Sequence, residues 1–311
     1  MKKNETREPL TSGQIAGSSS CKSERVTHAL ILAAGTGSRL RPLTLDAPKC
    51  LTEVGGKPIL GRQIDSLRTQ GIRNLVMVTG FEDGQIHRYL DRHAADMQVD
   101  YVFNPLYATT NNIYSLWLAK HLIDGPFMLL ESDLVFETSM LDSMLQPDRV
   151  AVSNILPWMN GTTVELDANG AVTSFNLSHG SDDVPCYKTV NIYTLSAQNW
   201  QATATRLDQY ISAGRTNDYY EAVFAEMIPD GTVRFEAVFF DENKWYEIDT
   251  VNDLSAADTL FHPLPRFVTK HEHFLRVGAG ESMKKRGKDK TVIAKIATAS
   301  SGAAAAMGRP N

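Results

Sequence analysis

The chain has 311 residues, of which 42% are hydrophobic and 22% are charged, and its formal net charge is −5. This length and composition permit one large α/β domain or two small ones, and the acidic balance argues against general nucleic-acid binding, which needs a basic surface. No run approaches the roughly 18 to 20 apolar residues that cross a bilayer, so we expect no membrane span.

The N-terminal residues 1–26 are rich in Ser, Gly, Lys and Glu, which predicts a disordered leader. No apolar stretch follows their basic residues, so we do not expect a secretory signal. The three cysteines, Cys21, Cys50 and Cys186, form no CxxC pair and no disulfide framework. A cytoplasmic location is the expectation that follows.

The first predicted strand, residues 29–34, runs into a glycine-rich loop at residues 35–39, Gly-Thr-Gly-Ser-Arg. Bare glycines let backbone N–H groups close on phosphate oxygens, so this loop predicts phosphate binding. It matches neither the P-loop nor the dinucleotide fingerprint, which needs a third glycine where this chain has Leu40. An ordinary turn from strand to helix, with a chance Arg and Lys, is the alternative.

Strands and helices then alternate along the first half of the chain. We predict a helix from Pro58 to Gly71, a helix at 83–94, a helix at 112–122, and strands at 75–79, 98–103 and 126–130. This order predicts a Rossmann-like α/β fold with a mostly parallel mixed sheet and helices on both faces. Ligands of such sheets lie beyond the carboxyl ends of the strands, where the glycine loop and Asp133 both fall.

From Arg149 the pattern changes to shorter extended pieces, which predict a smaller lid and acceptor subregion. The predicted strands are 150–156, 162–166, 171–175, 187–195, 234–240 and 244–248, and the predicted helices are 196–212, 218–227 and 251–260. Residues 263–311 lose this periodicity and carry ten Lys/Arg against three Asp/Glu. They predict a basic disordered tail or linker.

The order Leu-Ala-Ala-Gly-x-Gly-x-Arg-Leu at residues 32–40, followed by Pro42 and by the pair Pro48-Lys49, resembles the signature of the sugar-phosphate and choline-phosphate nucleotidyltransferases. Three further stretches, at residues 104–105, 111–116 and 245–249, are similar to bacterial phosphocholine and 2-aminoethylphosphonate cytidylyltransferases more than to the sugar branch. The resemblance covers residues 27–262, which we take as the nucleotidyltransferase domain. It implies the fold of the nucleotide-diphospho-sugar transferases.

The activity that the resemblance implies is transfer of CMP from CTP to a small aminoalkyl phosphonate or phosphate, with release of pyrophosphate. The acceptor is 2-aminoethylphosphonate or phosphocholine, and we lean towards the phosphonate. A sugar-1-phosphate nucleotidyltransferase that uses UTP, dTTP or GTP is the nearest alternative, and an inactive nucleotide-binding regulator is a second one. The sequence leaves the assembly open, with a homodimer among the alternatives.

The resemblance also assigns roles to residues on the nucleotide side. Arg39 and Lys49 would be the catalytic cations, and Asp133 and Asp249 would bind Mg²⁺, with Glu131 and Glu247 in reserve. Asp249 could instead cap the helix that follows it. The predicted nucleotide-binding residues are Leu32, Ala33, Ala34, Gly35, Gly37, Asn111 and Asn112. For the two asparagines, reading of a pyrimidine edge and capping of a helix remain equal alternatives.

The acceptor's amino end is a cation, which favours carboxylates or aromatic faces. The stretch Asp218-Tyr219-Tyr220-Glu221, with Tyr193 and Trp245, supplies both types. From these, Asp218, Tyr193 and Trp245 are predicted to bind the acceptor, although packing in the core is an alternative for each ring. Lys188 is a charge inside an otherwise apolar strand and must reach an anion or water. We assign it to the acceptor's phosphonate or phosphate, with a salt bridge at the rim as the alternative.

Overall fold

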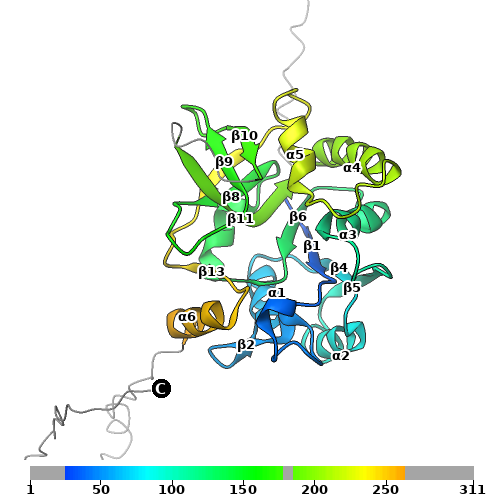
Figure 1. Cartoon of the computed structure of the whole chain (residues 1–311), viewed down its shortest axis with the longest axis vertical. Helices are drawn as coiled ribbons and strands as arrows, with labels where there is room; N and C mark the ends of the chain where they lie inside the picture. The colour runs from blue at the N-terminus through cyan, green and yellow to red at the C-terminus, as the bar shows by residue number, and fades with distance from the viewer. Residues whose placement is uncertain (1–24, 178–184, 263–311) are drawn as a thin grey trace, which may run out of the picture. The chain divides into compact units, whose positions relative to one another are not determined.

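The computed structural model describes residues 25–177 and 185–262. Nine of the strands in these residues form one mixed sheet, with helices packed against it, which confirms the predicted α/β class (Figure 1). The strands of this sheet are β1 (His28–Ala33), β4 (Asn74–Thr79), β5 (Gln98–Phe103), β6 (Phe127–Glu131), β8 (Arg149–Ser153), β9 (Thr163–Leu166), β10 (Val172–Asn176), β11 (Cys186–Leu195) and β12 (Glu236–Phe239).

The remaining elements are helices and two short strand pairs outside the large sheet. The α-helices are α1 (Ile59–Thr69), α2 (Asp83–His93), α3 (Asn112–Leu118), α4 (Ala197–Ser212), α5 (Glu221–Met227) and α6 (Val251–Phe261). The strand pairs are β2 (Glu53–Val54) with β3 (Lys57–Pro58) and β7 (Leu134–Phe136) with β13 (Trp245–Glu247). The 3-10 helices are η1 (Ser38–Leu40), η2 (Lys49–Leu51), η3 (Ala119–Leu122) and η4 (Thr138–Met144).

The first half of the chain builds the parallel part of the sheet, in the order β6-β1-β4-β5. Leu32 near the end of β1 lies opposite Glu131, the last residue of β6. Because these strands are parallel neighbours, the glycine loop after β1 and the Ser132-Asp133 segment after β6 leave the sheet at the same edge. The register of two strands therefore brings two separate motifs together.

Strand β11 attaches the second half of the chain to the first. Its last four residues pair with β6 in antiparallel fashion, and its first three pair with β9 on the same side. Strand β8 pairs with the other side of β11, and β12 runs parallel to β8. Since β11 is antiparallel to β6, the residues before Ile192 extend past the end of β6 and reach the edge where the glycine loop lies.

Side chains from alternate positions of β1 enter two hydrophobic cores on opposite faces of the sheet. Leu30 and Leu32 belong to a core with α3, α4 and α5, whereas Ala29, Ile31 and Ala33 belong to a core with α1 and α2. Figure 1 shows α3, α4 and α5 gathered together, apart from α1 and α2. This alternation confirms the prediction of helices on both faces.

Local signals at the ends of the helices agree with the predicted boundaries. Helix α1 starts directly after Pro58, and Gly71 beyond its end has φ of +79°, a conformation that favours glycine. The side chain of Ser196 accepts a hydrogen bond from Asn199 N and so caps α4. Thr250 and Asp253 form a capping box at the start of α6.

Several details differ from the prediction. The helix expected at 112–122 changes at Leu118 into the 3-10 helix η3, and the short strand β7 was not predicted. Val26, which the prediction places in the leader, is buried, and its backbone N–H donates to Leu145 O at 3.0 Å. Residues 1–24 of the leader and the basic tail lie outside the described residues. No helix within the described ranges is long and apolar enough to cross a membrane.

Candidate active site

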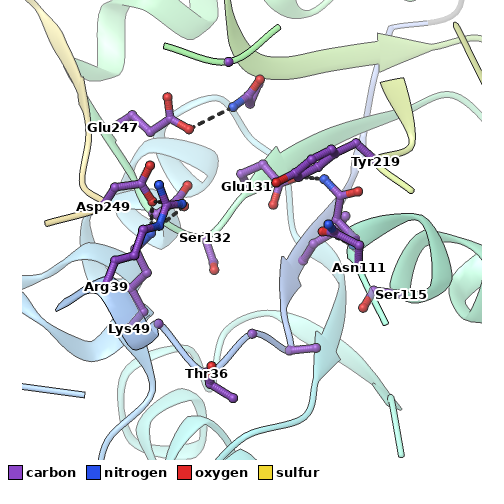
Figure 2. A pocket seen from close by; sticks show the side chains of 18 of the residues that line it. Thr36, Arg39, Lys49, Asn111, Ser115, Glu131, Ser132, Tyr219, Glu247 and Asp249 are labelled. Carbon is purple, nitrogen blue, oxygen red and sulfur yellow. Dashed lines mark hydrogen bonds and ion pairs between the residues drawn. The ribbon is translucent and has the colours of Figure 1, made fainter. Parts of the chain in front are cut away.

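A cavity of about 510 Å³ opens at the carboxyl ends of β1 and β6. Its lining comes from both halves of the chain, because the glycine loop and the segment 131–133 meet residues of β11, the loop 160–162 and the start of α5 there. Figure 2 shows Arg39, Lys49 and Asp249 on one side of the space and Asn111 and Tyr219 on the other. The volume is within the range of small-molecule sites.

The two glycines of the loop have different structural roles. Gly37 has φ of +61°, and a Cβ there would lie 3.0 Å from Lys49 Cβ and 3.2 Å from Thr44 Cγ2. The Thr44 hydroxyl donates to Gly37 O at 2.7 Å. A Cβ at Gly35 would meet no protein atom within 4 Å. Gly37 therefore serves the packing of Lys49 against the loop, whereas Gly35 faces the open cavity.

A single lysine joins the two predicted metal ligands. Lys49 Nζ lies 2.8 Å from Asp133 Oδ2 and 2.8 Å from Asp249 Oδ1, and Arg39 Nη2 lies 2.8 Å from the same Asp249 oxygen. We call these four residues the charged cluster. The Lys49, Asp133 and Asp249 side chains are 13 to 20% exposed, whereas that of Arg39 is 64% exposed. Arg39 is thus the member that can most readily change partners.

The ladder between β7 and β13 brings the two aspartates together. Glu247 pairs with Leu134, and the next residue, Ile248, donates its backbone N–H to Asp133 O at 3.0 Å. Asp249 therefore lies beside Asp133 although it follows a different strand. The carboxylate that caps α6 belongs to Asp253, so the alternative that Asp249 is the helix cap is not supported.

The electrostatics of the charged cluster favour a protonated lysine. Burial alone would lower the pKa of Lys49, but the nearby carboxylates of Asp133 and Asp249 raise it by more, so its pKa lies above the ordinary value. The adjacent Cys50 is buried, and burial raises the pKa of its thiol to about 12. A thiol with that pKa is a poor nucleophile at neutral pH, so Cys50 is a core residue.

The paired asparagines make different structural contacts. Asn111 caps α3, because its side chain accepts from Asn112 N at 2.8 Å. Asn112 links two other elements, since its Nδ2 donates to Glu131 Oε1 at 3.1 Å and its Oδ1 accepts from Tyr220 N at 3.0 Å. Both asparagines also line the cavity.

Lys188 is buried, at 2% exposure, and lines the cavity. Its Nζ donates to Thr189 O at 2.7 Å and lies 3.4 Å from Glu247 Oε2. Asn191 donates to the other oxygen of Glu247 at 3.2 Å, from a residue with φ of +58° at an irregularity of β11. The predicted lysine therefore reaches an anion inside the cavity wall, not at the rim.

Two further carboxylates lie in the same wall, Glu221, which is buried, and Glu131, which is half-buried. Burial, with the charges of Asp133 and Glu221 as smaller causes, raises the pKa of Glu131 well above its ordinary value. Glu221 is 4% exposed, and burial raises its pKa to about 7, although the charge of Lys188 acts in the opposite direction. This part of the cavity therefore favours a cation or a proton at neutral pH.

Four predicted site residues do not line the cavity. Ala33 points into the core on the opposite face of the sheet from Leu32, because successive side chains of a strand alternate. Tyr193 and Trp245 are fully buried in the two cores, which leaves no ring face for an acceptor. Asp218 forms an ion pair with Arg215 at 2.7 Å and lies outside the cavity lining. The other predicted residues all line it, namely Leu32, Ala34, Gly35, Gly37, Arg39, Lys49, Asn111, Asn112, Asp133, Lys188 and Asp249.

Sequence reasoning named the stretch 218–221 as a source of carboxylates and aromatic faces but selected Asp218 from it rather than Glu221, and it did not assign the loop 160–162 to the site. Glu221 had a usable signal, because it is a charged residue at the start of a helix whose next residues, Ala222 to Phe224, are apolar and buried. The loop 160–162 had no sequence signal of this kind. It reaches the cavity through its packing against Lys188.

The charged cluster offers oxygen ligands for a divalent metal. Asp133 Oδ1 is buried and has no hydrogen-bond partner within the described residues. This oxygen is therefore available to bind a ligand. Among these residues no group of three or more His, Cys, Asp or Glu side chains is placed to hold a metal by itself. A Mg²⁺ ion at a triphosphate site needs only one or two carboxylates, because phosphates and water complete its octahedron.

The glycine loop and the charged cluster lie together at the carboxyl ends of the parallel strands. This arrangement is typical of an enzyme that binds phosphate groups. The chain belongs to the nucleotidyl transferase family, whose sequence model matches residues 28–261. This confirms the family predicted from the glycine loop and from Lys49.

Three relatives illustrate the range of this similarity. The chain is 32% identical to the CMP-5'-(3-aminopropyl)phosphonate synthase of Streptomyces rubellomurinus, over 76% of this chain and 39% of that protein. It is 27% identical to the choline-phosphate cytidylyltransferase of Streptococcus pneumoniae, over 72% and 94%. It is also 27% identical to the 2-aminoethylphosphonate cytidylyltransferase of Lancefieldella rimae, over 75% and 92%. The chain therefore spans nearly all of two of these relatives and less than half of the first.

Solved structures share the fold. The CTP:phosphocholine cytidylyltransferase from Streptococcus pneumoniae matches with a TM-score of 0.67 and 24% identity, over 76% of this chain and 99% of that one. A UDP-glucose pyrophosphorylase matches with a TM-score of 0.62 and 16% identity, over 76% and 98%. These similarities confirm the predicted fold of the nucleotide-diphospho-sugar transferases.

Proposed function

We propose that the chain transfers CMP from CTP to a small aminoalkyl phosphonate or phosphate and releases pyrophosphate. An oxygen of the acceptor's phosphonate or phosphate forms a bond to the α-phosphorus of CTP. The bond from that phosphorus to the oxygen bridging it to the β-phosphate breaks, and its electron pair leaves with pyrophosphate. The observation that carries this proposal is the charged cluster, in which Lys49 and two aspartates meet beside a glycine loop.

The chemistry requires cations more than a general base. A phosphate monoester has a second pKa of about 6, so the attacking oxygen is largely ionised at neutral pH. The difficulty is to bring two anions together and to stabilise charge on the equatorial oxygens of the transition state. In this proposal Lys49 stabilises the α-phosphate. Arg39, which is mostly exposed, leaves Asp249 to bind the triphosphate through its planar guanidinium group.

The metal in this proposal is Mg²⁺, held by Asp133 and Asp249. Carboxylate oxygens are the ligands that this hard cation prefers, and Asp133 Oδ1 has no other partner among the described residues. When bound, the metal would neutralise part of the phosphate charge. Lys49 remains within reach of the same carboxylates and keeps them oriented towards the cavity.

Two different parts of the chain form the two sides of the cavity, which supports a separate binding place for each substrate. The backbone of the glycine loop faces the space beside Lys49, where N–H groups can approach phosphate oxygens. Residues from the second half of the chain, including Lys188 and Glu221, form the remaining wall and would surround the acceptor. The choice of CTP and of an aminoalkyl acceptor rests on the names of the relatives given above.

The test is release of pyrophosphate from CTP, UTP, dTTP and GTP in the presence of MgCl₂ and a panel of acceptors. The panel contains 2-aminoethylphosphonate, 3-aminopropylphosphonate, phosphocholine and glucose 1-phosphate. We expect release with CTP and at least one of the first three compounds. Turnover of the sugar phosphate alone, or of no acceptor with CTP, would contradict the proposal.

A further inference from the structure

One carboxylate in the cavity wall has no part in the chemistry proposed above. Glu221, the first residue of α5, is 4% exposed and lines the cavity. Its Oε2 atom is buried and has no hydrogen-bond partner in the described part of the chain. A buried carboxylate oxygen without a donor destabilises the folded state, so proteins rarely keep one without a use.

The surroundings of Glu221 carry more negative than positive charge. Glu131 and Glu247 line the same cavity, and the charge of Lys188 acts on Glu221 and Glu247. Lys49 also acts on Glu247, but it is already paired with the two aspartates of the charged cluster. Lys188 already interacts with Glu247 Oε2 at 3.4 Å and donates to Thr189 O. One lysine cannot neutralise three carboxylates. Negative charges therefore outnumber positive ones in this region, and a bound cation would reduce the excess.

Asn112 and the backbone act on the Glu221 carboxylate as hydrogen-bond donors, but among the described residues no donor reaches its Oε2 atom. The Asn112 amide group donates to Glu131 Oε1 at 3.1 Å, on the side of that carboxylate which faces α3. The pKa of Glu221, raised by burial to about 7, agrees with a carboxylate that lacks sufficient donors. A ligand that supplies both positive charge and N–H bonds would satisfy it.

We propose that Glu221, with Glu131 nearby, binds the ammonium group of the acceptor, and that this ammonium carries N–H bonds. This inference rests on the proposed function and specifies its substrate class as primary amines. A quaternary ammonium has no N–H group and would leave Oε2 of Glu221 without a donor. Recognition of quaternary ammonium instead relies on several aromatic faces.

The aromatic residues near the cavity fit this distinction. Among the described residues that line it, Tyr107 and Tyr219 are the only aromatic ones. Trp158 is stacked on Tyr246 at 4.1 Å between ring centroids, and Trp245 is fully buried. The tryptophans that could enclose a trimethylammonium group are therefore engaged elsewhere.

The position of Lys188 also indicates how the acceptor is oriented in the cavity. Lys188 pairs with Glu247, which lies two residues before Asp249 of the charged cluster, and its charge also acts on Glu221. An acceptor with its ammonium group at Glu221 would have its anionic group towards Lys188 and the charged cluster. That orientation presents the phosphonate oxygen to the α-phosphate of the nucleotide.

The experiment compares three acceptors that differ only at the amino end. They are 2-aminoethylphosphonate, its N,N,N-trimethyl derivative, and propylphosphonate, in which a methyl group replaces the ammonium. Pyrophosphate release with CTP and MgCl₂ gives kcat/KM for each with the wild type, with Glu221→Gln and with Glu226→Gln. Glu226 lies on the same helix but pairs with Arg206 and Arg215, so its variant is the matched control.

We expect the wild type to prefer the primary amine over both analogues by a factor of at least about 10. In Glu221→Gln the preference over propylphosphonate should fall by a factor of about 10 to 100, since a hydrogen bond to a charged group contributes about 1.5 to 3 kcal/mol. Glu226→Gln should keep the wild-type preference. Melting temperatures establish that each variant is folded.

The outcomes separate this inference from the proposed function. A wild type that turns over the trimethyl derivative as well as the primary amine would overturn the inference, whether or not Glu221→Gln folds. An unchanged preference in a folded Glu221→Gln protein would also overturn it. If no acceptor of the panel supports pyrophosphate release with CTP, the proposed function itself is wrong.

Discussion

Lys49 Nζ lies 2.8 Å from Asp249 Oδ1, although 200 positions of the chain separate the two residues. Asp133 completes the contact from a third segment, with Oδ2 also 2.8 Å from Lys49 Nζ. The lysine follows the glycine loop, whereas the two aspartates are held together by the ladder of β7 and β13. The charged cluster therefore depends on the tertiary structure of the domain, and the predictions below test its members separately.

Lys49→Ala should lower turnover by a factor of at least about 100, because removal of one charge contact to the transition state typically costs about 2.7 to 4 kcal/mol. Pyrophosphate release at saturating CTP measures this effect. Lys244→Ala is the control, since Lys244 forms only long surface ion pairs with Glu137 and Asp241. A folded Lys49→Ala protein with the wild-type rate would show that Lys49 is not catalytic.

Asp249→Asn should raise the MgCl₂ concentration needed for half-maximal rate by a factor of about 10 or more, since even residues that only support metal ligands change affinity 10- to 100-fold. A magnesium titration of the rate gives this value. The control is Asp241→Asn, since Asp241 is an exposed carboxylate in the turn before β13, accepts from Asn243 N and does not line the cavity. A normal titration for Asp249→Asn would remove Asp249 from the metal site.

The two loop glycines should respond differently to alanine. Gly37→Ala should destabilise the fold by about 1 to 2 kcal/mol, because residue 37 has φ of +61° and a Cβ would press against Lys49. Gly35→Ala should keep wild-type stability, since its Cβ meets no protein atom, but should raise the KM for CTP. Urea unfolding and initial rates measure the two effects. Wild-type KM in Gly35→Ala would argue against close approach of phosphate to the loop.

The stability of the protein should depend on pH through Glu221. Its pKa is about 7 in the folded state and near the ordinary 4.5 in the unfolded chain, so the folded state holds the proton more tightly. This group's contribution to stability is therefore greatest below pH 4.5 and declines as pH rises to about 7. Relative to the wild type, Glu221→Gln should become progressively more stable over that range.

Neighbouring charges make a difference measurement necessary here. Lys188 acts on Glu221, and Glu131 and Glu247 lie in the same wall, so several groups contribute to the absolute profile. Urea unfolding of wild type and Glu221→Gln at pH 5 and pH 8 isolates the contribution of residue 221. A stability difference that is the same at both pH values would contradict the raised pKa.

Much of the fold and half of the site could be predicted from the sequence. The apolar run of β1, the helix start at Pro58 and the spacing of strands in the first half are local signals, and the structure agrees with them. Pairing of β7 with β13 could not be predicted, because each strand has only three residues and too little periodicity to show. Because that ladder cannot be predicted from local sequence, only the resemblance to the nucleotidyltransferases indicates that Asp133 and Asp249 lie close together.

The acceptor side was predicted least well, for a physical reason. Tyr193 and Trp245 have the chemistry to bind a cation, but whether a ring faces a ligand or the core depends on packing against other elements. Glu221 and Asp218 are three positions apart, and the fold buries one carboxylate in the cavity wall and pairs the other with Arg215 outside it. Composition could not distinguish these two environments.

The sequence by itself determined the glycine loop, because glycines at fixed spacing after an apolar strand impose their backbone geometry locally. It also determined the residue types of the charged cluster. Only the tertiary structure decided which carboxylates meet Lys49 and which buried carboxylate oxygens have no hydrogen-bond partner in the described cavity wall. Long-range strand pairing and burial set these contacts, and both depend on the whole domain rather than on any segment of it.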